Sequence, residues 1–98
     1  MLALRARGWT VGVVERRHGG KSHDLFGMWD ILAMRDGRLI AVQATSGSNV
    51  AARMAKVRSA EALLEWRLLA ATRSYVVGWR LLKVGKRRLW RARWVRIT

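Results

Sequence analysis

The stretch WDILAMRDGRLIAVQAT, residues 29–45, decides the fold because it predicts a β-hairpin whose register can be counted. Asp36-Gly37 lies between two β-rich runs, and this dipeptide suits a type I′ turn, which needs positive φ at both central residues. With these two residues as the loop, counting outward along the strands places Asp30 directly opposite Gln43.

Polar side chains gather at one end of one face of this predicted hairpin. Residues two apart along a strand share a face, so Thr45 joins Asp30 and Gln43 there. We expect the Gln43 amide to hydrogen-bond the Asp30 carboxylate, because a buried carboxylate without a partner is costly. Glu15 and Asp24 lie just upstream and could fold toward the same corner. Such a cluster of oxygen donors predicts a site for a hard divalent cation.

Charge is the strongest feature of the composition. The 98 residues include 20 Lys and Arg against 6 Asp and Glu, which gives a net charge of +14. A globular domain this basic most often binds polyanions, so DNA or RNA is the first candidate partner. Hydrophobic residues make up 51% of the chain, too many for a disordered basic tail.

The composition also limits the cellular setting. The chain has no cysteine, which excludes disulfides and thiolate zinc sites and suits a cytoplasmic protein. No apolar run reaches the length of a membrane span, so we expect no membrane partner. Without repeats or linkers, we expect a single domain over residues 1–98.

Periodicity along the chain predicts an α/β domain in the order α-β-β-β-α-β-β. The hairpin strands are apolar on both faces apart from their polar end, which is typical of strands in the middle of a sheet covered by helices. Ser59 could interrupt the second helix. The expected helices span residues 2–7 and 49–69, the expected strands span residues 9–14, 26–34, 39–45, 75–82 and 89–97, and residues 15–23 are expected to form a polar loop.

The last expected strand alternates tryptophan and arginine. Trp90 and Trp94 share one face, and Arg91 and Arg93 share the other. Core packing is the commoner role of a strand tryptophan, so we expect the tryptophans to lie inside and the arginines outside. Base stacking by the tryptophans is the alternative.

The order of elements and the motif that starts at Asp30 resemble the PD-(D/E)XK, or restriction-endonuclease-like, nuclease superfamily. In that pattern an Asp at the start of the second strand is followed, after a spacer, by an acid-x-Lys triplet. Here D-ILAMRDGRLIAV-QAT places Asp30, Gln43 and Thr45 at the three positions. DLFGMWD, residues 24–30, resembles the approach to the Asp in resolvase-like phage proteins. The resemblance covers about residues 8–80.

The resemblance implies a DNA endonuclease that hydrolyses phosphodiesters with Mg²⁺ or Mn²⁺. Branched DNA such as Holliday junctions is among the substrates that it implies. It implies a central mixed sheet of about five strands with flanking helices. The cation would activate water and neutralise the phosphate under attack. The implied metal ligands are Asp30, Gln43 and the Ala44 carbonyl, completed by Asp24 or Glu15.

Two positions depart from the family pattern. Gln43 offers a carbonyl oxygen without charge, and Thr45 cannot supply the cation of the family lysine. Because that lysine can migrate to a neighbouring helix, Lys56 is the expected substitute, on a helix stripe shared with Asn49 and Arg53. The expected catalytic positions are therefore Asp30, Gln43, Thr45 and Lys56.

Partners and alternative functions complete the expectations. A homodimer and a phage origin are expected by analogy with resolvase relatives. The alternatives are a catalytically inactive DNA-binding or nuclease-accessory module of the same fold, and a structural basic protein of an RNA particle. The expected DNA contacts are Arg16, Arg17, Lys21, Asn49, Arg53 and Lys56.

Overall fold

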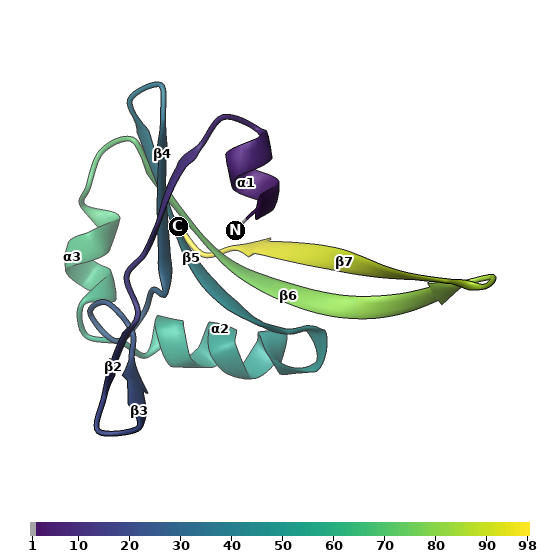
Figure 1. The fold of residues 1–98 in the computed structure, drawn as a ribbon. Helices are drawn as coiled ribbons and strands as arrows, with labels where there is room; N and C mark the ends of the chain where they lie inside the picture. Colours follow the sequence, from purple (N-terminus) through teal and green to yellow (C-terminus); the bar gives the residue numbers. More distant parts are fainter. Residues whose placement is uncertain (1) are drawn as a thin grey trace.

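A five-stranded mixed sheet forms the centre of the computed structural model, which describes residues 2–98; residue 1 of the expected domain lies outside them. Its strands are β1 (Thr10–Val13), β4 (Ile31–Arg35), β5 (Arg38–Ser46), β6 (Thr72–Val84) and β7 (Arg87–Arg96). They lie in the order β1-β4-β5-β6-β7 (Figure 1). The β5–β6 pair is parallel and the other pairs are antiparallel. The expected mixed α/β sheet of about five strands is confirmed.

The β4–β5 hairpin has the register that the turn residues predict. The pairing runs from Arg35↔Arg38 to Ile31↔Val42. Asp36 and Gly37 have φ values of 49° and 75°, so both central residues adopt the left-handed region. Local turn chemistry therefore determines which side chains of both strands face each helix layer.

The expected order of elements was wrong, because residues 15–23 are not a loop. They form a small separate hairpin of β2 (Arg16–His18) and β3 (Lys21–His23). Gly19 and Gly20 connect the strands with φ values of 58° and 78°, which glycine adopts without steric cost. The side chains of both short strands are exposed, so hydrophobic alternation could not reveal them.

The expected strand over residues 26–34 begins too early. β4 starts at Ile31, and the chain before it makes a turn closed by an isolated bridge between Leu25 and Trp29. Phe26 and Gly27 have φ values of 56° and 73°, which no strand tolerates. This turn buries Met28 and Trp29 completely and places Asp30 just before the strand.

The helices are shorter than expected, and they are α1 (Leu2–Ala6), the 3₁₀ helix η1 (Gly47–Asn49), α2 (Val50–Arg58) and α3 (Leu63–Arg67). The anticipated interruption at Ser59 is confirmed. The Ser59 hydroxyl donates to the Lys56 carbonyl oxygen over 2.9 Å, which ends α2. Within residues 2–98, no helix is long and apolar enough to cross a membrane.

Alternate residues of β4 and β5 pack on opposite sides of the sheet. Ile31 and Ile40 join Leu4 of α1 in one buried cluster, whereas Ala41 joins Val57 of α2 in a second. Helices therefore cover both faces, with α1 on one and α2 and α3 on the other (Figure 1). The expectation of central strands buried on both faces is confirmed.

The strands β6 and β7 extend beyond the rest of the sheet (Figure 1). The β5–β6 ladder ends at Ser46↔Trp79, whereas β6 and β7 stay paired as far as Val84↔Arg87. We call residues 79–92 the ribbon. Trp90 is 66% exposed and Trp94, at its base, is 38% exposed, so the expectation that both lie inside was wrong.

Candidate functional site

Acidic side chains meet where the β2–β3 hairpin joins the main sheet. Glu15 precedes β2 and Asp24 follows β3, and the closing pair Arg16↔His23 puts both acids at the same end of the hairpin. The Val14 amide donates to the Asp30 carbonyl oxygen over 2.9 Å, which holds the start of this hairpin beside Asp30. We call Glu15, Asp24, Asp30, Gln43 and Lys56 the acidic corner.

Gln43 is the buried centre of the acidic corner, with only 2% of its surface exposed. Its Nε2 atom donates to Asp24 Oδ2 and to the Met28 carbonyl oxygen, each over 2.7 Å. The expected hydrogen bond to Asp30 was therefore wrong. The turn over residues 25–29 delivers Asp24 and Met28 to the amide, and no strand continuing through these residues could do so. Both Nε2 protons are used, which leaves Oε1 as the atom that Gln43 could offer to a cation.

The Asp30 carboxylate caps the end of the β4–β5 ladder. The Ala44 amide donates to Asp30 Oδ1 and Oδ2 over 3.1 and 3.2 Å. Since the amide and the carbonyl of one strand residue point to the same side, the Ala44 carbonyl also leaves β5 toward Asp30. Asp30 and Ala44 thus bring carboxylate and main-chain oxygens to one place.

Lys56 reaches the acidic corner from α2. Its Nζ atom lies 2.7 Å from Asp24 Oδ2, the same oxygen that accepts the Gln43 amide. The Lys56 side chain is 43% exposed and that of Asp24 is 10% exposed, so the cation remains accessible to solvent while its partner is nearly buried. Lys56 thus faces the corner, as its expected role requires.

Burial and neighbouring charges shift the pKa values of Asp30 and Asp24 in opposite directions. Desolvation by burial raises the pKa of Asp30 to about 6; the charges of Asp24 and Glu15 add to this rise and the Ala44 hydrogen bond opposes it. Burial also acts to raise the pKa of Asp24, but the hydrogen bonds from Lys56 and Gln43 outweigh it and the pKa falls below its ordinary value. Asp30 is therefore the carboxylate that lacks a compensating cation.

The acidic corner has the donor chemistry of a magnesium or manganese site. Both ions prefer oxygen ligands, and the corner presents carboxylate, amide and main-chain oxygens. Within residues 2–98, no group of three or more His, Cys, Asp or Glu side chains is close enough to hold a metal by itself. Asp30 and Asp24 would hold the ion, with Gln43 and Ala44 beside them and Glu15 nearby. A cation there would relieve the repulsion that contributes to the raised pKa of Asp30.

The remaining expected residues lie at different distances from this centre. Thr45 is half-buried two residues beyond Gln43 on β5 and, in the described part of the chain, makes no side-chain hydrogen bond with Asp30. Arg53 is half-buried on α2, and its charge helps to lower the pKa of Asp24. Three of the expected DNA contacts are exposed on the β2–β3 hairpin, namely Arg16, Arg17 and Lys21. Asn49 is exposed on η1.

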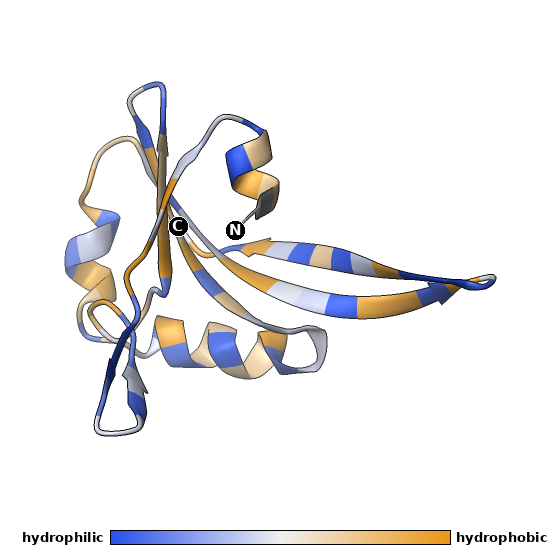
Figure 2. Ribbon diagram, in the orientation of Figure 1, coloured by the Kyte–Doolittle hydropathy of each residue, from blue (hydrophilic) through white to orange (hydrophobic). Residues whose placement is uncertain are grey.

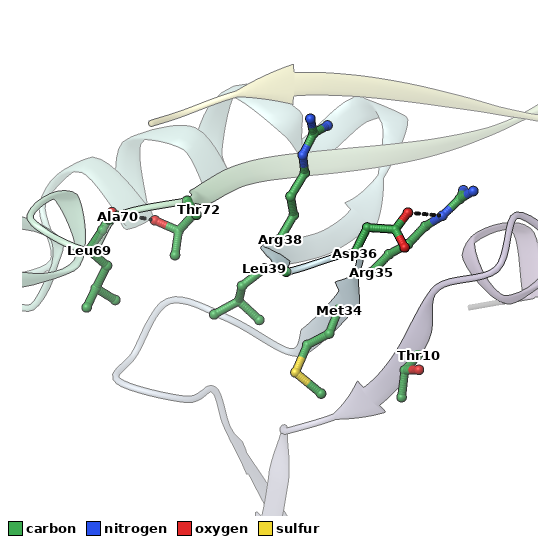
Figure 3. Close-up of a pocket in the computed structure, with 11 residues that line it drawn as sticks. Thr10, Met34, Arg35, Asp36, Arg38, Leu39, Leu69, Ala70 and Thr72 are labelled. Carbon is green, nitrogen blue, oxygen red and sulfur yellow. Dashed lines mark hydrogen bonds and ion pairs between the residues drawn. The ribbon is translucent and has the colours of Figure 1, made fainter.

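A separate hollow of about 600 Å³ lies at the opposite end of the β4–β5 hairpin (Figure 3). Met34 and Leu39 line it beside the turn, where Arg35 Nε lies 3.3 Å from Asp36 Oδ2. Figure 3 shows this ion pair at the rim, directed away from Met34. The hollow thus holds a surface ion pair without a cluster of converging polar groups.

Sequence reasoning missed the pairing of Asp24 with Gln43 and Lys56. The signal that could have found the β2–β3 hairpin is Gly19-Gly20 between two short polar runs, since such a pair suits a two-residue hairpin loop. That hairpin would have carried Asp24 toward Glu15.

Comparisons with protein-family models, curated proteins and solved structures gave no match to this chain.

The raised pKa of Asp30 predicts a loss of stability as pH rises. The folded state holds this proton more tightly than the unfolded chain, so the free energy of unfolding should fall between pH of about 4 and about 6, by about 1–2 kcal/mol because Asp30 is only partly buried and solvent screens its charge. Asp30→Asn should remove this fall. Denaturant unfolding of both proteins at the two ends of this range, without divalent ions, measures the difference, and parallel pH profiles would contradict it.

Replacing Gln43 by Glu tests the hydrogen bond from Gln43 to Asp24 Oδ2, the oxygen that also accepts from Lys56. Gln43→Glu replaces a donor with a carboxylate facing Asp24, so the metal-free protein should lose about 1–3 kcal/mol of stability at neutral pH. It should also bind Mn²⁺ more tightly, because the corner gains a charged oxygen. Thermal unfolding with and without Mn²⁺ gives both results. A variant as stable as the wild type without metal would show that the Gln43 donor is dispensable.

Proposed function

We propose that the chain is a metal-dependent DNA endonuclease with a restriction-endonuclease-like core. The observation that carries the proposal is the acidic corner, where Lys56 and Gln43 both donate to Asp24 beside an Asp30 carboxylate of raised pKa. The accessible ammonium and the carboxylate oxygens match the two parts that phosphodiester hydrolysis needs, a cation for the phosphate and ligands for a metal.

The mixed five-stranded sheet supports the proposed core. The antiparallel strands β1, β4 and β5 are followed by η1, α2 and α3, and then by β6 in parallel with β5. This is the expected run of strands, helix and strand, with the β2–β3 hairpin inserted between the first two. Asp30 lies immediately before the second strand of that run, which begins at Ile31, next to the position that the Asp has in the family pattern.

Each residue of the acidic corner has a proposed task. A bound Mg²⁺ or Mn²⁺ would supply Lewis acidity and an activated water. Asp30 and Asp24 would ligate the ion, and the buried Gln43 would fix the orientation of Asp24 through its 2.7 Å hydrogen bond. Lys56 would stabilise negative charge on the phosphate, in place of the family lysine that Thr45 cannot replace.

The net charge of +14 supports DNA as the partner. The proposed substrates are Holliday junctions or other branched DNA. The proposed protein is a cytoplasmic homodimer that a phage encodes. The second candidate is an inactive DNA-binding module of the same fold. Two observations favour this inactive module. Gln43 has no charge to offer a metal, and Lys56 is already paired with Asp24.

Asp30→Asn separates cleavage from binding. It removes the proposed metal ligand, so cleavage of branched and linear DNA with Mg²⁺ or Mn²⁺ should fall to background. DNA affinity should persist and should still decrease steeply as salt rises from low to physiological concentration.

Asp36→Asn is the matched control, because Asp36 is an exposed acid at the far end of the same hairpin. It should cleave like the wild type. If wild type and Asp30→Asn bind DNA alike but neither cleaves in either metal, the inactive module is the correct function.

Lys56→Ala tests the proposed substitute for the family lysine. Loss of one charge-stabilising donor should slow cleavage about 100-fold or more and leave DNA binding nearly unchanged. Arg58→Ala, an exposed cation on the same helix, is the control and should cleave normally. Single-turnover cleavage with saturating protein measures both rates. Equal rates for the two variants would remove Lys56 from the mechanism.

A further inference from the structure

The ribbon carries large aromatic and apolar side chains where the structure provides little to cover them. Leu81, Leu89 and Trp90 are 44%, 49% and 66% exposed. Figure 2 shows apolar and polar residues alternating along this projecting part of β6 and β7. Exposed tryptophan on an isolated strand pair needs an explanation, because such a pair is only marginally stable in water.

The register divides the ribbon into an aromatic face and an arginine face. The aromatic face consists of the opposed pairs Trp79↔Ala92 and Leu81↔Trp90, followed near the tip by Lys83↔Arg88. The other face carries the pairs Arg80↔Arg91 and Leu82↔Leu89. The tryptophans and the arginine pair therefore point to opposite sides of the same two strands.

The aromatic face is one wall of an open hollow of about 610 Å³ that α1 borders on the other side. This size falls in the range of roughly 300–1,000 Å³ found for small-ligand pockets. Trp94 packs edge-on against Tyr75 with ring centroids 5.6 Å apart, which fixes part of the wall. The side chains that matter here are Arg7, Trp9, Tyr75, Trp79, Trp90 and Trp94.

The residues that line the hollow include a cation and no acid. No Asp or Glu follows Glu65 in the sequence. Arg7 lines the α1 side of the hollow, and Lys83 and Arg88 lie further along the same face toward the tip of the ribbon. Aromatic surfaces flanked by cations are the combination that binds unpaired nucleotides, with bases on the rings and phosphates on the cations.

We propose that this aromatic hollow binds unpaired bases of a DNA strand, with Trp90 as the most accessible stacking surface. The inference rests on the proposed DNA binding and refines its substrate to DNA with single-stranded or branch-point nucleotides. The acidic corner and the hollow then recognise different parts of one substrate, the phosphodiester and the unpaired base.

Charge and shape favour this occupant over a second copy or a membrane. A second copy seated on the aromatic face would bring like charges together, because Lys83, Arg88 and Arg7 border that face and no acidic residue of the ribbon offsets them. A lipid surface would contact projecting side chains, whereas the tryptophans here line a concave wall between two elements. A flat base fits a concave aromatic wall.

Trp90→Ala and Arg91→Ala form a matched pair of tests, since the two side chains are adjacent on β7 and point to opposite faces. Binding to a short oligo(dT) strand and to a duplex of equal length is measured in EDTA at low and physiological salt, by tryptophan fluorescence and by anisotropy of labelled DNA. EDTA suppresses cleavage, so the result does not depend on the acidic corner.

The wild type should show fluorescence quenching by oligo(dT), and Trp90→Ala should bind oligo(dT) about tenfold more weakly with unchanged duplex affinity and salt slope. Arg91→Ala should weaken both ligands and lower the salt slope by about 1. An equal loss on both ligands in Trp90→Ala, or no loss, would overturn the proposal. So would tryptophan signals that respond to anionic phospholipid vesicles or to dimer formation and not to DNA. The endonuclease proposal would survive these outcomes if cleavage still depended on Asp30.

Discussion

One buried amide holds the acidic corner together. Gln43 lies on β5 just beyond the end of the β4–β5 ladder with 2% of its surface exposed, and its Nε2 atom donates to both Asp24 and the Met28 carbonyl oxygen. A buried amide without partners would cost about 1–3 kcal/mol, so these two hydrogen bonds help to fix the turn before β4 against β5. That turn in turn places Asp30 at the end of the ladder and Asp24 within reach of α2.

The same arrangement explains why the two aspartates differ. Asp24 accepts from Lys56 and Gln43 on one oxygen, whereas the Asp30 carboxylate accepts from main-chain amides and has no cation beside it among residues 2–98. Burial thus costs Asp30 more, and its pKa rises to about 6. A fold that only needed stability would place an uncharged residue there; a carboxylate kept at this cost suits a site that gains a cation with its substrate.

Sequence reasoning succeeded where the determinant was local and failed where it was not. The hairpin register follows from Asp36-Gly37, and the end of α2 follows from Ser59. The partner of Gln43 could not be predicted, because the left-handed Phe26 in the preceding turn moves Asp24 into place. The exposure of Trp90 was also beyond reach, because alternation shows which residues share a face and not whether another element covers that face.

The position of Gly78 has a mechanical consequence for the molecule. A Cβ atom at Gly78 would lie 2.3 Å from Val50 Cγ2, so the first turn of α2 rests directly on the backbone of β6 just before the ribbon leaves the sheet. Close-packed contacts of this kind transmit displacement and do not absorb it. The ribbon therefore leaves the sheet next to the point where α2 packs on β6. Any side chain larger than hydrogen at this position would push α2, the helix that carries Lys56, away from β6.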